Sequence, residues 1–115
     1  MKSNQLKCLT DLPEPPYFSV IFTSLRSDVT DAYAETAERM LELAALQEGF
    51  LGVDSVRQGK TGITVSYWKD EQSILSWKQQ IEHQAAQSRG KSDWYDEYTV
   101  RIAKVEHSYS FVKGD

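Results

Sequence analysis

The chain has 115 residues, of which 40% are hydrophobic and 26% are charged, and its formal net charge is −4. This length suits one domain with a modest core, and the acidic balance excludes the basic footprint of a nucleic-acid-binding protein. The lone cysteine, Cys8, excludes an internal disulfide and a cysteine-based metal site, so we expect a reducing, cytoplasmic setting. No apolar run approaches the length of a membrane span, and the N-terminus lacks the apolar region of a signal peptide.

The first 16 residues contain all three prolines of the chain, Pro13, Pro15 and Pro16. Proline restricts its own backbone and that of the preceding residue to extended conformations. We therefore expect an extended N-terminal arm over residues 1–16, followed by one domain over residues 17–115. The sequence leaves open whether this arm leads directly into its own domain or folds over a partner subunit.

A strand and a helix are expected first. Residues Tyr17–Leu25 are rich in β-branched and aromatic side chains, with apolar residues on both parities, which predicts a strand covered on both faces. An amphipathic helix follows, with Thr30 as its N-cap and Gly49 as its C-cap. Its apolar stripe has helical spacing and comprises Tyr33, Ala37, Met40, Leu41 and Ala44.

A hairpin and a second helix come next. The strands Phe50–Arg57 and Ile63–Trp68 flank the glycine-containing stretch "QGKTG", which predicts a turn. Asp70 is expected to cap the following helix, and Gly90 to end it. Ile74, Trp77, Ile81 and Ala85 share one face of that helix.

The last elements complete the fold. "DWYDEY" suggests a short helical turn, and Thr99–Phe111 the final strand, with a bulge near residues 103–104 where the apolar parity changes. The order strand, helix, strand, strand, helix, strand predicts an α+β, ferredoxin-like antiparallel sheet with both helices on one face. The other face also carries apolar residues, so we expect a second copy of the chain to cover it.

Three stretches carry a family resemblance: "EGFLGVDSVR", "ITVSYWKDEQSILSWK" and "WYDEYTVRIAKVEHSYSF". The chain resembles the antibiotic biosynthesis monooxygenase family, part of the dimeric α+β barrel superfamily, over roughly residues 17–111. The resemblance implies a homodimer whose two sheets meet face to face. It also implies a pocket in each subunit between the sheet and the helices.

The resemblance implies two kinds of chemistry. Some members oxidise polycyclic aromatic substrates with molecular oxygen and use no flavin, metal or heme, so no cofactor is expected here. Others bind heme and degrade it. In the heme-degrading branch Trp77 matches the helical tryptophan, but Gln87 stands at the position of the heme-ligating histidine, with His83 four residues earlier. The first strand also lacks the asparagine that both branches place there, so heme degradation is the third hypothesis.

Two tryptophans are candidates for substrate binding. Trp77 belongs either to the core, where large aromatic side chains contribute most burial, or to a pocket wall against a flat substrate. Trp68 ends a strand and is expected at the sheet edge or the dimer interface, with substrate contact as the alternative.

The catalytic candidates are His83, Arg101 and Tyr98. His83 is either a solvent-facing or capping residue, or a general base. Arg101 lies between apolar residues, so we expect it to be buried and paired with Asp54 or Glu97, or to orient a substrate carboxylate or phenolate.

The remaining candidates are tyrosines and a histidine. Tyr98 and the substrate-binding candidate Tyr95 either donate to a substrate oxygen or close the dimer rim. His107 is expected at the interface. Two histidines on separate elements do not indicate a metal site.

The favoured function is a cytoplasmic, monooxygenase-like enzyme that carries out cofactor-independent oxygenation of a small aromatic or conjugated substrate. The alternative is a non-catalytic small-molecule-binding or stress-response dimer of the same fold. Neither a nucleic acid nor a membrane is expected as a partner.

Overall fold

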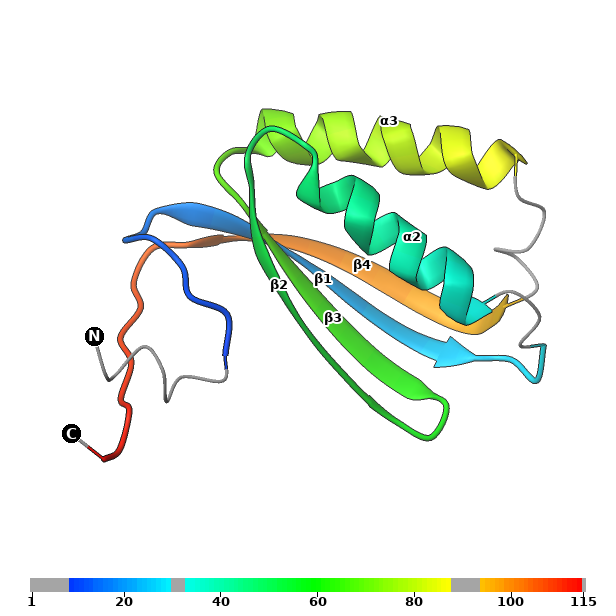
Figure 1. The fold of residues 1–115 in the computed structure, drawn as a ribbon, viewed down its shortest axis with the longest axis horizontal. Coiled ribbons are helices and arrows are strands. Elements are labelled where there is room, and N and C mark those ends of the chain that lie inside the picture. The colour runs from blue at the N-terminus through cyan, green and yellow to red at the C-terminus, as the bar shows by residue number, and fades with distance from the viewer. Residues whose placement is uncertain (1–8, 30–32, 88–93, 115) are drawn as a thin grey trace.

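The computed structural model describes residues 9–29, 33–87 and 94–114. Its elements follow the predicted order: β1 (Tyr17–Arg26), α2 (Tyr33–Ala45), β2 (Phe50–Gln58), β3 (Thr61–Trp68), α3 (Glu71–Gln87) and β4 (Tyr95–Val105). The strands form an antiparallel sheet in the order β2-β3-β1-β4, and both helices lie on one side of it (Figure 1). The ferredoxin-like α+β fold predicted from the sequence is therefore confirmed.

The β2–β3 hairpin turns more tightly than predicted. The strands extend to Gln58 and Thr61, so only Gly59 and Lys60 remain in the turn. Gly59 has φ +60, the left-handed conformation that tight hairpin turns require.

The final strand differs from its prediction. It spans Tyr95–Val105, so most of the expected helical turn is strand, while residues 91–93 lie outside the described part of the chain. The expected bulge at residues 103–104 is wrong, because the register with β1 runs without a break from Val105 to Glu97 and shifts between Leu25 and Arg26. The strand ends at Val105, where its partner β1 begins at Tyr17, and residues 106–112 have no strand assignment.

The core lies between the helices and the middle of the sheet. Trp68 has no exposed surface, and its ring stacks on Trp77 with centroids 6.1 Å apart. Phe50 packs edge-on against Trp68 at 5.3 Å, and Trp68 Nε1 donates to Ser66 Oγ at 2.9 Å. The prediction that Trp68 lies at the sheet edge or dimer interface is wrong, because β3 is an inner strand and this side chain faces the helices.

The helix signals are partly confirmed. Asp70 caps α3, since its Oδ1 accepts hydrogen bonds from Ser73 N at 2.8 Å and Ser73 Oγ at 2.7 Å. In α2 the core-facing residues include Leu43, whereas Leu41 is 46% exposed. The predicted caps Thr30 and Gly90 lie outside the described residues.

The described part of the N-terminal arm lies against β2. Thr10 Oγ1 donates to the carbonyl oxygen of Val53 at 2.6 Å, and Thr10 N donates to Asp54 Oδ1 at 3.1 Å. Asp54 also accepts a hydrogen bond from Tyr67 Oη at 3.0 Å. Tyr67 belongs to the sheet face that points away from the helices, which we call the open face. On β1 the open face carries the alternate residues Tyr17, Ser19, Ile21, Thr23 and Leu25.

Candidate functional site

One row of residues crosses the helix side of the sheet near the β2–β3 turn. The register pairs Arg57 of β2 with Gly62 of β3, Gly62 with Ser24 of β1, and Ser24 with Tyr98 of β4. Directly opposed residues in neighbouring strands point to the same face of a sheet. These four residues therefore lie side by side beneath the helices.

Gly62 leaves space for the arginine beside it. A Cβ atom at this position would lie 2.6 Å from Arg57 Nη2, so any side chain would displace the guanidinium. Arg57 Nη2 instead reaches α2 and donates to Tyr33 Oη at 3.0 Å, while its Nη1 donates to the carbonyl oxygen of Lys60 at 3.2 Å.

A second arginine lies on the same tyrosine. Arg26 Cζ is 3.6 Å from the centroid of the Tyr33 ring, which is a close cation–π contact. Tyr95 Oη donates to Tyr33 Oη at 3.4 Å. We call Arg26, Tyr33, Arg57 and Tyr95 the arginine–tyrosine cluster.

The surroundings of Tyr95 disfavour the ionised form of its side chain. Burial raises the pKa of Tyr95 well above its ordinary value, and the hydrogen bond to Tyr33 raises it further, against a smaller opposing effect of the two guanidinium groups. Tyr95 therefore keeps its proton to a higher pH than an exposed tyrosine does, and its hydroxyl can donate a hydrogen bond.

An exposed apolar stripe continues from this cluster along β4. Tyr98, Val100 and Ile102 face the helix side of the sheet, yet they are 46%, 48% and 53% exposed. The reason is that α2 packs mainly on β2 and α3 mainly on β3, whereas β4 is the far edge strand. Phe22 of β1 borders this β4 stripe, with its ring 5.3 Å from that of Tyr98.

The structure brings together some of the predicted site residues. Tyr95 and Tyr98 are neighbours, with ring centroids 5.8 Å apart. Trp68 and Trp77 lie in the core, and Trp77 is only 9% exposed. His83 belongs to α3, but its side chain is outside the described part of the structure.

Arg101 is not part of this group. It pairs in register with Ile21, so it lies on the open face, opposite to the helices. The expectation that Arg101 is buried is wrong, because its side chain is exposed, and the proposed partner Asp54 is bound by Thr10 and Tyr67 instead.

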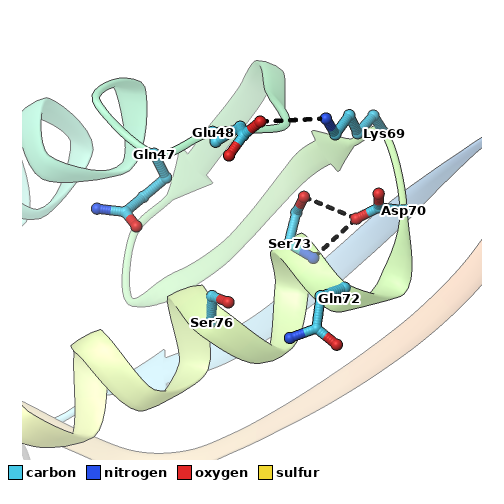
Figure 2. Close-up of a pocket in the computed structure, with 7 residues that line it drawn as sticks. All are labelled: Gln47, Glu48, Lys69, Asp70, Gln72, Ser73 and Ser76. Carbon is cyan, nitrogen blue, oxygen red and sulfur yellow. Dashed lines mark hydrogen bonds and ion pairs between the residues drawn. The ribbon is translucent and has the colours of Figure 1, made fainter.

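A hollow of about 360 Å³ lies elsewhere, at the start of α3 (Figure 2). Its lining is polar, and Lys69 Nζ lies 3.6 Å from Glu48 Oε2 at its rim. Asp70 and Ser73 of this lining are bonded to each other in the helix cap. The hollow does not reach the β4 stripe. The residues that line it are Gln47, Glu48, Lys69, Asp70, Gln72, Ser73 and Ser76.

Among the described residues, no helix has the length and apolarity needed to cross a membrane. In the same part of the chain, no group of three or more histidine, cysteine, aspartate and glutamate side chains could hold a metal ion.

Sequence reasoning missed Arg26, Arg57 and Tyr33 as site residues. A signal was present for Arg26, which continues the alternation of Phe18, Phe22 and Ser24 along the helix-facing side of β1. No local pattern indicated that Arg57 would cross over a glycine of the adjacent strand.

With the fold and this site in view, the comparisons with known proteins define the class of protein. The sequence model of the antibiotic biosynthesis monooxygenase family matches residues 16–89. The chain belongs to this family. It is 53% identical over 104 residues to the uncharacterized protein YqjZ of Bacillus subtilis, a match that covers 90% of this chain and 91% of that protein.

More distant relatives have named activities. A protein of Pyricularia oryzae named jasmonate monooxygenase is 27% identical over 97 residues, which cover 79% of this chain but only 44% of that protein. The solved structure of SnoaB, a cofactor-independent oxygenase from Streptomyces nogalater, has a TM-score of 0.66 at 9% identity and covers 80% of this chain and 95% of SnoaB. A dimeric ferredoxin-like protein of unknown function from Thermobifida fusca has a TM-score of 0.59 at 11% identity, with coverages of 84% and 99%. At these identities the two structures support the fold alone.

Proposed function

We propose that the chain is an oxygenase for a small aromatic or conjugated molecule, which binds on the helix side of the sheet against the β4 stripe. The observation that carries this proposal is the exposure of Tyr98, Val100 and Ile102, three neighbouring apolar and aromatic residues, on the sheet face that carries the helices. Apolar and aromatic surface beside a few convergent polar groups is typical of small-molecule sites.

The proposed chemistry is cofactor-independent. The substrate is deprotonated to an enolate or phenolate and supplies the electrons to molecular oxygen. A methylene group of the substrate becomes a carbonyl, one oxygen atom enters the product, and the other leaves as water with the two hydrogens. The name of the Pyricularia protein, a monooxygenase, supports this class of reaction.

The residues would divide the work by position. Tyr95 and Tyr98 lie at one end of the stripe, where a hydroxyl can donate to a developing oxyanion. His83 on α3 remains the candidate general base. Trp77 and Trp68 act indirectly, since their stacked pair fixes α3 on the sheet.

The assembly and setting belong to the same proposal. We propose a homodimer formed through the open face, supported by the dimeric neighbour from Thermobifida fusca. We also propose the division into an arm over residues 1–16 and a domain over residues 17–115, and a cytoplasmic location.

Oxygen consumption tests the proposal. Purified protein, with no added cofactor, is expected to consume oxygen in the presence of an anthrone or a reduced quinone. Ile102→Asp places a charge on the stripe and should raise KM at least tenfold, whereas Leu46→Asp, at a position that is 78% exposed on the α2 side, should leave it unchanged. No uptake with any of these substrates would contradict the proposal.

A non-catalytic binding protein is the second candidate. It is favoured by the tight aromatic packing between α3 and the sheet, where Trp68, Trp77 and Phe50 occupy the space that a larger interior pocket would need. A ligand that copurifies in native mass spectrometry and binds again without oxygen consumption would support this candidate over the first.

A further inference from the structure

We infer that the ligand of the β4 stripe is an anion: an aromatic or conjugated carboxylate whose carboxyl group is bound by Arg26, Arg57 and Ser24. This inference rests on the proposed function for the location of the aromatic part, and it adds the chemical class of the substrate.

The arginine–tyrosine cluster carries two positive charges on its arginines. Arg26 and Arg57 both contact Tyr33, and within the described residues neither guanidinium has a carboxylate partner. The nearby Lys60 is already paired with Asp28. Two guanidinium groups on one neutral ring are mutually repulsive, so an anion between them would be stabilised by both.

Two buried polar atoms of this region, Ser24 Oγ and Arg26 Nε, lack hydrogen-bond partners among the described residues. Ser24 is 4% exposed. A buried polar atom without a partner costs about 1–3 kcal/mol. Both residues belong to the end of β1, and Ser24 lies beside Gly62, across which the Arg57 guanidinium extends. Ser24, Arg26 and Arg57 thus bring hydrogen-bond donors to one region of the sheet, at the end of β1 and beside Gly62.

The region around Ser24 is continuous with the β4 stripe. Ser24 pairs with Tyr98, and Val100 and Ile102 follow at two-residue steps along the same face of β4. The four residue steps from Tyr98 to Ile102 span roughly 13 Å of strand. A flat aromatic molecule of two or three fused rings fits within this length. A planar carboxylate suits the fork geometry of guanidinium donors better than a compact point charge would.

The test compares two probes of the same shape, a naphthalene carboxylate and the neutral naphthylmethanol, by calorimetric titration. The protein is expected to bind the carboxylate at least tenfold more tightly. Arg57→Gln and Arg26→Gln should each reduce that preference severalfold and leave the affinity for the alcohol unchanged. Arg39→Gln is the matched control, because Arg39 is a solvent-exposed arginine of α2 paired with Glu42.

The outcomes separate the two proposals. Equal affinity for both probes would overturn the anion site and leave the oxygenase proposal standing. Binding of neither probe would overturn the location on the stripe, and with it both proposals. A preference that survives both glutamine variants would place the anion elsewhere. Displacement of the carboxylate probe by inorganic phosphate, but not by acetate at the same concentration, would replace the carboxylate by a phosphate.

Arg26 is partly buried, so its variant is checked by circular dichroism. If Arg26→Gln does not fold, the exposed Arg57 still decides the question, because its removal leaves the core untouched.

Discussion

At the scale of the residue, Trp68 is the most buried side chain of the core. Its indole has no exposed surface and contacts both the α3 tryptophan Trp77 and the β2 residue Phe50. Trp68→Ala should lower the free energy of unfolding by about 3–5 kcal/mol, because it removes a large buried side chain and leaves a cavity. Urea unfolding measures the change. Leu46→Ala, at a position 78% exposed, should change it by at most about 0.5 kcal/mol, and a similarly small loss for Trp68→Ala would show that the core does not depend on this ring.

Tyr67 makes the stability of the protein depend on pH in the alkaline range. Burial and the hydrogen bond to Asp54 raise the pKa of Tyr67 from 10.0 to about 12. Below pH 10 its contribution is complete. Between pH 10 and pH 12 the unfolded chain releases this proton while the folded chain retains it, so stability falls as pH rises.

Tyr67→Phe should therefore make the loss of stability across this pH window smaller than in the parent protein. Urea unfolding at several pH values within the window measures the slope. Tyr95, whose pKa is also raised, is present in both proteins and cancels in the comparison. Tyr109→Phe, at a position 99% exposed, is the control. An unchanged slope in Tyr67→Phe would mean that the phenol is not held neutral by the fold.

At the scale of the element, the contact between the arm and β2 depends on the absence of a side chain. A Cβ atom on Gly52 would lie 2.3 Å from Thr10 Cγ2. Gly52→Ala should cost about 1–3 kcal/mol, as overpacking usually does. Thr10→Ser removes the clashing methyl group and keeps the hydroxyl that bonds to Val53.

A double-mutant cycle tests this contact by denaturant unfolding. The double variant Gly52→Ala, Thr10→Ser should lose less free energy of unfolding than the two single variants lose together, with a coupling energy of about 1 kcal/mol. Gly59→Ala is the control for backbone strain, because that glycine has φ +60 but nothing within 4 Å of the added atom. Strict additivity between the changes at Gly52 and Thr10 would show that the position of the arm does not depend on the close contact of Thr10 with Gly52.

The elements themselves were largely predictable, since their order, the hairpin and the Asp70 cap each have a local signal in the sequence. Which faces of these elements are covered by other elements could not be predicted from the sequence. Val100 and Ile102 alternate as a strand should, but only the packing of the helices decides that their side of β4 stays exposed. The contact of Arg57 with Tyr33 joins two elements across a glycine of a third, and no sequence period encodes it.

At the scale of the whole molecule, the open face is the proposed dimer interface. It includes Ile63, which is 41% exposed although it is apolar and lies in the sheet. Ile63→Glu should dissociate the proposed homodimer without unfolding the subunit, because it buries a charge only in the dimer. Sedimentation equilibrium should give twice the chain mass for the parent protein and the single chain mass for the variant.

Leu46→Glu, on the helix side, should remain dimeric. A parent protein that sediments as a monomer while folded would remove the open face as an interface.

The position of β1 between β3 and β4 has a consequence for how the chain acquires its fold. One edge of β1 pairs with β4, and Tyr17 lies opposite Val105, so the two strands are far apart in the sequence. In contrast, β2 and β3 are sequence neighbours that pair across a two-residue turn. Pairing of neighbouring strands closes a short loop and is fast. Pairing of segments that are distant in the sequence is slower, because closing a long loop costs more chain entropy. During synthesis one edge of β1 therefore remains unpaired until β4 has left the ribosome. A nascent chain stalled before β4 would present that edge to other chains, so the risk of aggregation through this edge lasts until β4 has paired with β1.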